Sequence, residues 1–416
     1  MKLEERGRAK YRPLKEYDPV EVKQLLLNKI KEEEQLIREL PNEYDMPILD
    51  YKEDKINVIS LFSGCGGLDL GVELAGLSAM IGEERALNSF KDKELYDSVR
   101  KESIFHTVYS NDLFKEANES YRLNFPKVYQ QEIDIRKVKS FPNADLVLGG
   151  FPCPGFSEAG PRLIDDERNF LYIHYIRCLL QAKPYAFIAE NVKGMLTLGK
   201  GEVINQIVQD FSSAGYNVKF KLVNARDYGV PQIRERVFII GIRNDLDFDY
   251  EFPEPTHGED KMPFVTLKEA IGDLVDYPGE WFEGSFSPIY LSRNRKKAWD
   301  EQSFTIQASG RQAPLHPSGP SMVKLEADMW ELPGDPSLHR RLSVKEIARI
   351  QTFPDWFEFF DGGNMSVQKN NRLNKQYKQI GNAVPVMLAK AISMPIAIWA
   401  KDKINQAMQI NEPVLK

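Results

Sequence analysis

The sequence predicts an α/β protein with a doubly wound sheet, joined to a smaller and irregular second domain. Short apolar runs alternate with helical stretches between residues 56 and 243, which is typical of strands and crossover helices in such sheets. Several runs are apolar almost throughout, as parallel strands buried on both faces should be. After residue 243 the alternation stops and Pro, Gly, Ser and Arg become frequent, which indicates the second domain.

The composition narrows the class of protein. The net charge of −6 over 416 residues argues against a uniformly basic surface, so any nucleic-acid contact must be a local patch. The cysteines Cys65, Cys153 and Cys178 have neither metal-ligand spacing nor the pattern of a disulfide framework. We therefore expect a reduced, cytoplasmic setting without a metal site, and neither a signal peptide nor a membrane-spanning run.

The first 55 residues form a charged extension with one predicted helix, over residues 18–40. Asp18 can cap this helix and Pro19 suits its first turn. Its apolar stripe consists of Val22, Leu26, Ile30, Ile37 and Leu40. We expect the helix to pack on the outside of the main domain; an arm that contacts DNA or a partner is the alternative.

Five strands are predicted, over residues 56–62, 107–112, 145–150, 185–191 and 236–242. Ligands of such sheets bind beyond the carboxyl ends of the strands. After the irregular segment, Ser343 and Glu346 form a capping box at the start of a helix. An apolar helix over residues 379–404 is expected to pack back on the sheet. The predicted boundaries are 1–55, 56–243, 244–371 and 372–416.

Residues 59–71, ISLFSGCGGLDLG, lead from a strand through a glycine-rich turn into a helix. Glycines let a ligand approach the backbone, although a tight structural turn is the alternative because Asp69 replaces the last glycine of the dinucleotide pattern. Asp112 and Asp134 each follow a strand candidate, where a carboxylate can bind a ribose or an adenine amine. Taken singly, each is better interpreted as a surface carboxylate, but two of them at successive strand ends favour a binding site.

Cys153 lies between two prolines at the end of a predicted strand. Pro152 and Pro154 fix two φ angles and limit the freedom of the loop, which suits a nucleophile that must be held at a pocket. A nucleophilic thiol must be partly exposed and stabilised as its thiolate. A buried, inert thiol is the alternative, and it is the expectation for Cys65 and Cys178.

Three charged residues complete the candidate site. Glu190 ends an apolar strand, where a buried carboxylate is costly unless it is paired or used. Arg234 and Arg236 are two residues apart, so a strand would direct both to one face and allow them to clamp a phosphate or a carboxylate. A pair of surface ion pairs is the alternative.

Five stretches, in order, resemble the DNA (cytosine-5) methyltransferases: FSGCGGLDLG, GGFPCPGFS, ENV, QIRERVFIIG and QIGNAVP. The resemblance spans roughly residues 56–395. It implies a Rossmann-like, S-adenosylmethionine-dependent catalytic domain (56–243), a target-recognition domain (244–371) and a segment that returns to the catalytic domain (372–416). It also implies that the Cys153 thiolate attacks C6 of a flipped-out cytosine. Glu190 would contact N3 and the amine, Arg236 the base oxygen, and Arg234 the supporting backbone.

The resemblance also assigns cofactor contacts to six residues. Phe62 would stack on the adenine, Gly64 and Gly66 would lie beneath the methionine part, Asp112 would bind the ribose, Asp134 the adenine amine, and Asn382 the methionine end. Three departures from the family pattern are Pro154, where glutamine is commonest, an extra stretch near residues 83–105, and the N-terminal extension.

A basic patch lies within the predicted recognition domain. Residues 285–324 contain six Lys or Arg against two acids, a local charge of +4. The stretches SRNRKKAW and SFTIQASGRQAPLHP resemble those of GGCC-modifying members. Arg293, Arg295 and Arg311 are therefore predicted DNA contacts, because arginine is the commonest reader of guanine. A solvated basic face is the alternative for Lys296 and Lys297.

The expected partner is double-stranded DNA, methylated by a monomer that belongs to a restriction–modification pair. Its cognate endonuclease would share the site without needing to bind the methyltransferase. Three rival functions are an RNA cytosine methyltransferase, an inactive DNA-binding regulator and a thiol hydrolase. A recognition domain of about 100 residues favours DNA, the intact candidate residues disfavour the regulator, and a hydrolase would need a histidine in a recognisable motif.

Overall fold

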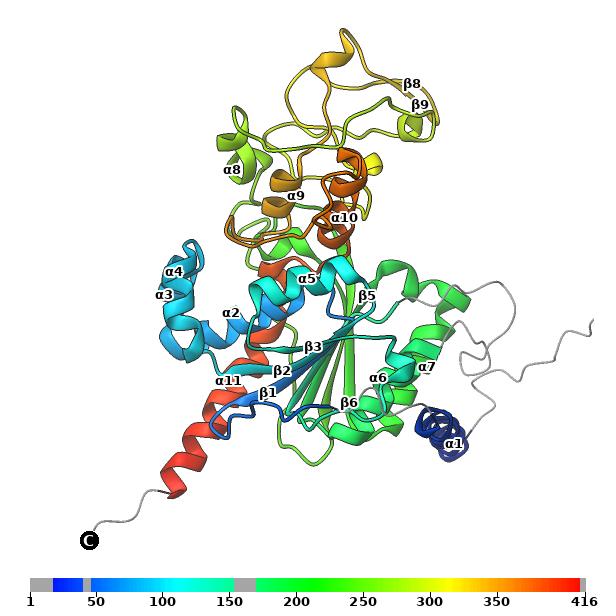
Figure 1. Ribbon diagram of the computed structural model, residues 1–416, viewed down its shortest axis with the longest axis vertical. Coiled ribbons are helices and arrows are strands. Elements are labelled where there is room, and N and C mark those ends of the chain that lie inside the picture. Colours follow the sequence, from blue (N-terminus) through cyan, green and yellow to red (C-terminus); the bar gives the residue numbers. More distant parts are fainter. Residues whose placement is uncertain (1–17, 40–45, 153–169, 412–416) are drawn as a thin grey trace, which may run out of the picture.

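The computed structural model describes residues 18–39, 46–152 and 170–411, and its centre is a seven-stranded sheet (Figure 1). The strand order is β3-β2-β1-β4-β5-β7-β6. The strands are β1 (Ile56–Leu61), β2 (Phe105–Asp112), β3 (Tyr129–Glu132), β4 (Leu146–Gly149), β5 (Ala186–Val192), β6 (Tyr216–Asn224) and β7 (Glu235–Arg243). The doubly wound α/β prediction is confirmed.

The five predicted strands are present, but the last of them runs the other way. β1 to β5 pair in parallel, whereas β7 is antiparallel to both β5 and β6. β6 escapes prediction because Lys219 and Lys221 interrupt its apolar residues, as the edge of a sheet permits. The reversal matters for the site, because it brings the first residues of β7 beside the last residues of β5.

One face of the sheet is covered by α2 (Gly67–Ile81) and α11 (Val386–Asn411), which cross in close contact (Figure 1). Gly71 allows this approach, since a Cβ there would lie 2.3 Å from the Cβ of Ala389. The prediction of a single apolar helix over residues 379–404 is wrong. It is divided into α10 (Lys369–Asn382) and α11, with Pro385 between them, where a proline ends one helix and can precede another.

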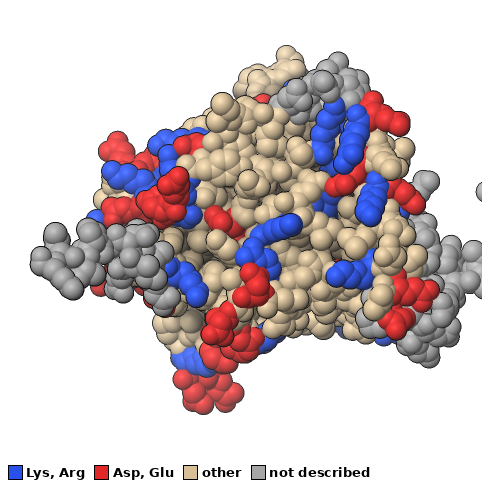
Figure 2. All heavy atoms as spheres, turned by 90° about the horizontal axis from the view of Figure 1, so that it is seen from below, with Lys and Arg blue, Asp and Glu red and all other residues tan. Residues whose placement is uncertain are grey.

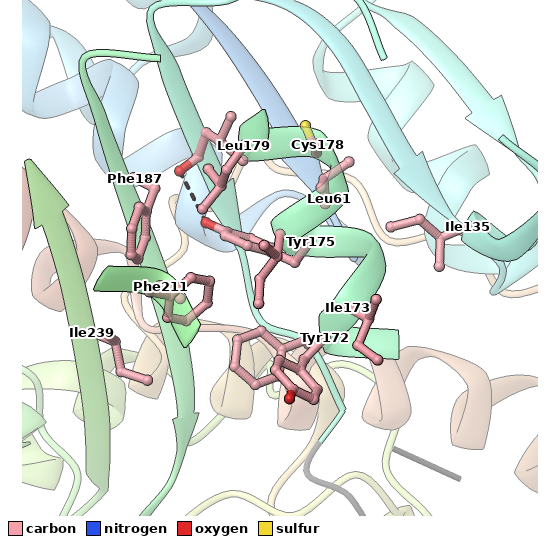
Figure 3. Packing of buried hydrophobic residues seen from close by; sticks show 14 of the residues in the cluster. Leu61, Ile135, Tyr172, Ile173, Tyr175, Cys178, Leu179, Phe187, Phe211 and Ile239 are labelled. Atoms are coloured by element: carbon pink, nitrogen blue, oxygen red, sulfur yellow. Dashed lines mark hydrogen bonds between the residues drawn. The ribbon is translucent and has the colours of Figure 1, made fainter. Parts of the chain in front are cut away.

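The other face is covered by α6 (Phe170–Ala182) and α7 (Glu202–Ser213). Figure 3 shows Tyr175 of α6 packed with Phe187 and Phe211 against the strands. The buried Tyr175 hydroxyl lies 3.2 Å from the carbonyl oxygens of both Val147 and Ile188, which satisfies its polar end. This packing fixes α6, the first described element after Pro152, against β4 and β5.

The N-terminal helix α1 (Pro19–Arg38) packs on α6 and α7. Asp18 caps it by accepting the backbone N–H of Val20 at 2.7 Å. Three members of its predicted apolar stripe, Leu26, Ile30 and Ile37, are buried. The expectation of a helix on the outside of the main domain is confirmed.

The smaller unit lies above the sheet in Figure 1 and contains little regular structure. It consists of residues 244–371, and its elements are α8 (Leu267–Ile271), β8 (Val323–Glu326), β9 (Met329–Glu331) and α9 (Val344–Ile350), with α10 beginning at its end. The predicted capping box of Ser343 and Glu346 is present at the start of α9. The extra stretch forms α3 (Glu83–Phe90) and α4 (Lys93–Val99), followed after β2 by α5 (Lys115–Asn124). Trp356 docks on the extra stretch and donates its indole N–H to the Phe90 carbonyl at 2.9 Å.

One stretch of the described chain, Lys369–Asn405, is long and apolar enough to cross a membrane by length and composition alone. In the most apolar window of this stretch, 61% is buried inside the protein. Such burial is typical of a helix in the core of the protein. The face seen from below in Figure 2 carries basic and acidic side chains intermingled, without a broad area of one sign.

Candidate active site

A cavity of about 730 Å³ opens at the carboxyl edge of the parallel strands. It lies where β1 and β4 meet and the strand order reverses, the usual ligand-binding crevice of doubly wound sheets. Six residues from the sequence predictions line it: Phe62, Gly64, Asp112, Asp134, Glu190 and Asn382. These residues are far apart in sequence, and the sheet topology brings them together.

The glycine-rich turn shapes one wall of this cavity. Phe62 has a φ of 53° and Gly64 a φ of 54°, and a non-glycine residue in the left-handed region marks stored strain, which is common at functional sites. A Cβ built on Gly64 meets no atom within 4 Å, so a side chain there would occupy free space beside the cavity. Gly66 does not line the cavity; it precedes α2 with a φ of 93°, and Phe125 leaves no room for a Cβ.

Asp112 joins the end of β2 to the glycine turn. Its carboxylate accepts the backbone N–H of Gly64 at 2.9 Å and that of Phe114 at 2.7 Å. Burial nevertheless raises the pKa of Asp112 above its ordinary value, and the two N–H groups oppose that rise. The carboxylate is thus held rigidly at the cavity wall, where a ribose could reach its remaining lone pairs.

Asp134 follows β3 and caps a short 3₁₀ turn, Ile135–Lys137. The guanidinium of Arg136 lies 2.5 Å from its carboxylate and holds the pKa of Asp134 below its ordinary value. The negative charge at this end of the cavity is therefore largely neutralised within the protein. A neutral adenine amine suits such an environment better than a cation does.

Asp69 is the residue that sequence reasoning missed as part of this site. It lies in the first turn of α2, lines the cavity and is only 2% exposed. It accepts hydrogen bonds from the hydroxyls of Ser60 (2.9 Å) and Tyr121 (2.8 Å). Burial raises its pKa to about 6. Its position at the last glycine of the dinucleotide pattern was the only local signal.

Glu190 and Arg236 form an ion pair at the same edge, with 2.9 Å between Oε1 and Nε. Val192 of β5 pairs with Arg236 of β7 in the antiparallel register, which is why a residue at the start of β7 reaches one near the end of β5. Both side chains are mostly buried, 12% and 14% exposed. Glu190 also lines the cavity, and a Cβ built on Gly150 would lie 3.1 Å from its Oε2.

Arg234 does not share a ligand with Arg236, so the predicted clamp by two parallel guanidinium groups is wrong. It is 1% exposed and donates to the carbonyls of Ile306, Gly381 and Ala383 at 2.9–3.1 Å. It precedes β7 and ties the smaller unit to the α10–α11 junction. Arg234 thus holds three backbone segments together, and its proposed role in supporting the backbone remains a prediction.

The candidate nucleophile Cys153 lies outside the described residues, as does Pro154. The chain is described up to Pro152, which lines the cavity, and Phe151, which is buried. Asn191 donates to the Phe151 carbonyl at 2.9 Å and so fixes the backbone two residues before Cys153.

The other two thiols are inert. Cys65 and Cys178 are buried, and burial raises the pKa of Cys65 to about 12 and that of Cys178 further. A thiol that remains protonated at neutral pH is a poor nucleophile. The expectation for these two cysteines is confirmed.

The three predicted DNA-contact arginines differ in exposure. Arg293 and Arg311 are exposed on the smaller unit. Arg295 is 5% exposed and donates to the Tyr290 carbonyl at 3.0 Å and to the Gln312 amide oxygen at 2.8 Å. A contact of Arg295 with DNA would require these bonds to be exchanged.

This arrangement of cavity, carboxylates and ion pair agrees with the comparison with known families. The model of the C-5 cytosine-specific DNA methylase family matches residues 56–283 and 278–397. The chain belongs to this family. It is accordingly a C-5 cytosine DNA methyltransferase, in a family that generally uses S-adenosylmethionine.

Similar proteins span almost the whole methyltransferase. The Type II methyltransferase M.BsuRI of Bacillus subtilis is 64% identical over 96% of this chain and 93% of its own length. M.BspRI of Lysinibacillus sphaericus is 59% identical over 100% of this chain and 99% of its own length. The solved structure of the methyltransferase EhMeth of Entamoeba histolytica covers 84% of this chain and 99% of its own, with a TM-score of 0.55 and 18% identity, which supports the fold alone.

Proposed function

We propose that this methyltransferase modifies C5 of a cytosine in a GGCC-type duplex site, with S-adenosylmethionine as methyl donor and Cys153 as nucleophile. The observation that carries the proposal is the Glu190–Arg236 ion pair beside the cavity, adjacent to the strand end that leads to Cys153. A carboxyl group and a guanidinium fixed together can grip one edge of a cytosine ring, because the two groups offer complementary hydrogen bonds to N3 and O2.

The volume of the cavity and the residues that line it support S-adenosylmethionine as the cofactor. Its volume of about 730 Å³ lies within the range of small-molecule sites. Asp112 would bind the ribose, Asp134 the adenine amine and Asn382 the methionine end, with Phe62 stacked on the adenine and Gly64 giving access. When bound, S-adenosylmethionine supplies an electrophilic methyl group.

Cytosine C5 is a weak nucleophile, and the protein groups are proposed to activate it. The Cys153 thiolate forms a bond to C6 while Glu190 holds a proton at N3, which makes C5 electron-rich. Arg236 would orient the ring through its base oxygen, and Arg234 would keep the underlying backbone in place. After C5 is methylated, its proton leaves to a base and the sulfur–C6 bond breaks, which restores the thiolate. The target base must leave the helical stack to reach this site.

The smaller unit, residues 244–371, is proposed as the target-recognition domain. Its exposed Arg293 and Arg311 suit base or backbone contacts. Relatives named as Type II methyltransferases support a role in a restriction–modification system, whose endonuclease would recognise the same site. The protein is proposed to act as a monomer.

Covalent trapping tests the proposal directly. Duplexes that carry 5-fluorocytosine in GGCC, or in GCGC as a control, are incubated with the protein and S-adenosylmethionine. Fluorine at C5 cannot leave as a proton does, so a denaturant-resistant complex is expected on GGCC and not with Cys153→Ala. A complex on GCGC instead would overturn the assigned site, and a complex that persists in Cys153→Ala would overturn the assigned nucleophile.

A further inference from the structure

Three passes of the chain through the smaller unit meet at one buried side chain, Arg341, which is 2% exposed. Its Nη1 donates to the Gly284 carbonyl at 3.0 Å and its Nη2 to that of Ser285 at 3.1 Å. Its Nε donates to the Arg311 carbonyl at 3.3 Å. One guanidinium therefore joins segments near residues 284, 311 and 341.

Aromatic rings hold the same guanidinium in one orientation. Its carbon atom lies 4.5 Å from the ring centre of Phe286 and 5.0 Å from that of Tyr290. Cation–π contacts of this kind are stronger where water is excluded. The guanidinium is thus held by three carbonyl acceptors and by contacts with two aromatic rings.

The backbone that carries Arg311 is clamped from the other side as well. Arg311 lies in the 3₁₀ turn η11 (Gly310–Gln312). The N–H of Gly310 donates to the Asn374 amide oxygen at 2.9 Å, and a Cβ at Gly310 would lie only 2.7 Å from Tyr377. The Arg311 side chain is exposed, so it projects to solvent from a backbone that is hydrogen-bonded on both sides.

The charge of Arg341 has no acidic partner within the part of the chain that the structure describes. Burial of an unpaired cation is costly, and carbonyl oxygens and rings are its only compensation there. The neighbouring Arg340 differs, because it makes two 2.7 Å hydrogen bonds to the Glu346 carboxylate. The three carbonyl acceptors match the planar, multiple N–H donors of a guanidinium, which a lysine ammonium cannot reproduce.

We propose that Arg341 is a positioning residue for DNA sequence recognition, which fixes the backbone from which Arg311 reads the target site. The inference rests on the proposed role of residues 244–371 as the recognition domain. Arg341 would therefore set discrimination between sites, and the methyl-transfer step at Glu190 and Cys153 would not depend on it.

The test compares Arg341→Lys with the matched control Arg340→Lys, which alters the adjacent arginine of the same segment. Initial methylation rates are measured on a GGCC duplex and on duplexes with each single base changed. For Arg341→Lys we expect the preference for the best site to fall by about 10-fold or more, the range that one well-placed base contact provides. The maximal rate on the best site and the affinity for S-adenosylmethionine should change by less than about threefold. Arg340→Lys should retain the wild-type preference.

Arg311→Ala supplies the reference, because it removes the proposed reading side chain itself. If Arg311→Ala relaxes discrimination and Arg341→Lys does not, the proposal is overturned. It is also overturned if Arg341→Lys lowers the rates on all duplexes equally, or if it unfolds, since either result assigns Arg341 to domain stability alone. The preference is measured against whichever duplex the wild type modifies best. Failure of the GGCC assignment is therefore separate from failure of this proposal.

Discussion

The Asp69→Asn variant should be more stable than the wild type above pH 6. This difference in stability should disappear as the pH falls. The pKa of Asp69 is raised to about 6 from an ordinary 3.8 because the carboxylate is buried. An acid whose pKa is higher in the folded state binds its proton more tightly there. Its stabilising contribution is complete below the unfolded pKa of 3.8 and is lost as the pH rises through about 6.

The magnitude follows from the two pKa values. The full difference corresponds to about 3 kcal/mol, at about 1.36 kcal/mol per pH unit. When the pH falls from 8 to 5, the titration of Asp69 should raise the free energy of unfolding of the wild type by about 1.4 kcal/mol. This is less than the full difference because only the part of the range below the folded pKa contributes. Asparagine has nearly the same shape and no charge, so its contribution should not vary with pH.

Urea denaturation of both proteins at several pH values between 5 and 8 measures the difference in the free energy of unfolding. Subtraction removes the titration of all groups that the two proteins share. The groups around Asp69 are Ser60 on β1, Tyr121 on α5 and Glu73 on α2, and each is present in both proteins. A difference that stays constant across this pH range would refute the reasoning, since Asp69 would then not titrate within it.

Three further substitutions should act through named contacts. Gly71→Ala places a methyl group 2.3 Å from Ala389 and should lower the free energy of unfolding by about 1–3 kcal/mol in urea denaturation, because α2 and α11 must separate. Asn191→Ala frees the carbonyl of Phe151 and should lower kcat by about 10- to 100-fold in steady-state methylation assays, because the backbone that leads to Cys153 is no longer held at Phe151. Gly64→Ala should weaken cofactor binding, because its methyl group would occupy free space at the cavity.

Matched controls separate these effects from general damage. Gly82 has a positive φ of 89° and open space around a built Cβ, so Gly82→Ala introduces backbone strain at a position away from the cavity. Equal losses of cofactor affinity in Gly64→Ala and Gly82→Ala would contradict the cavity argument. The exposed Asn217 on β6 is the control for Asn191, and an equal fall in kcat there would argue against loop positioning. Undiminished stability of Gly71→Ala would show that α11 can shift without cost.

Local patterns were sufficient to predict much of the fold and of the site. Apolar runs of strand length, the cap at Asp18 and the capping box at Ser343 depend on neighbouring residues, and all are present. Asp112 and Asp134 could be predicted as cavity residues because parallel strands end at a common edge. The sequence by itself thus determined which residues reach that edge.

Only the tertiary structure decided what each side chain meets there. The antiparallel direction of β7 pairs Arg236 with Glu190, and the same turn of chain buries Arg234 under carbonyls from residues 306, 381 and 383. Asp69 is a buried acid whose carboxylate accepts hydrogen bonds from Tyr121 on α5 and Ser60 on β1. Burial and hydrogen-bond partners are set by segments far apart in the chain, and a local sequence pattern carries no information about which of them will pack together.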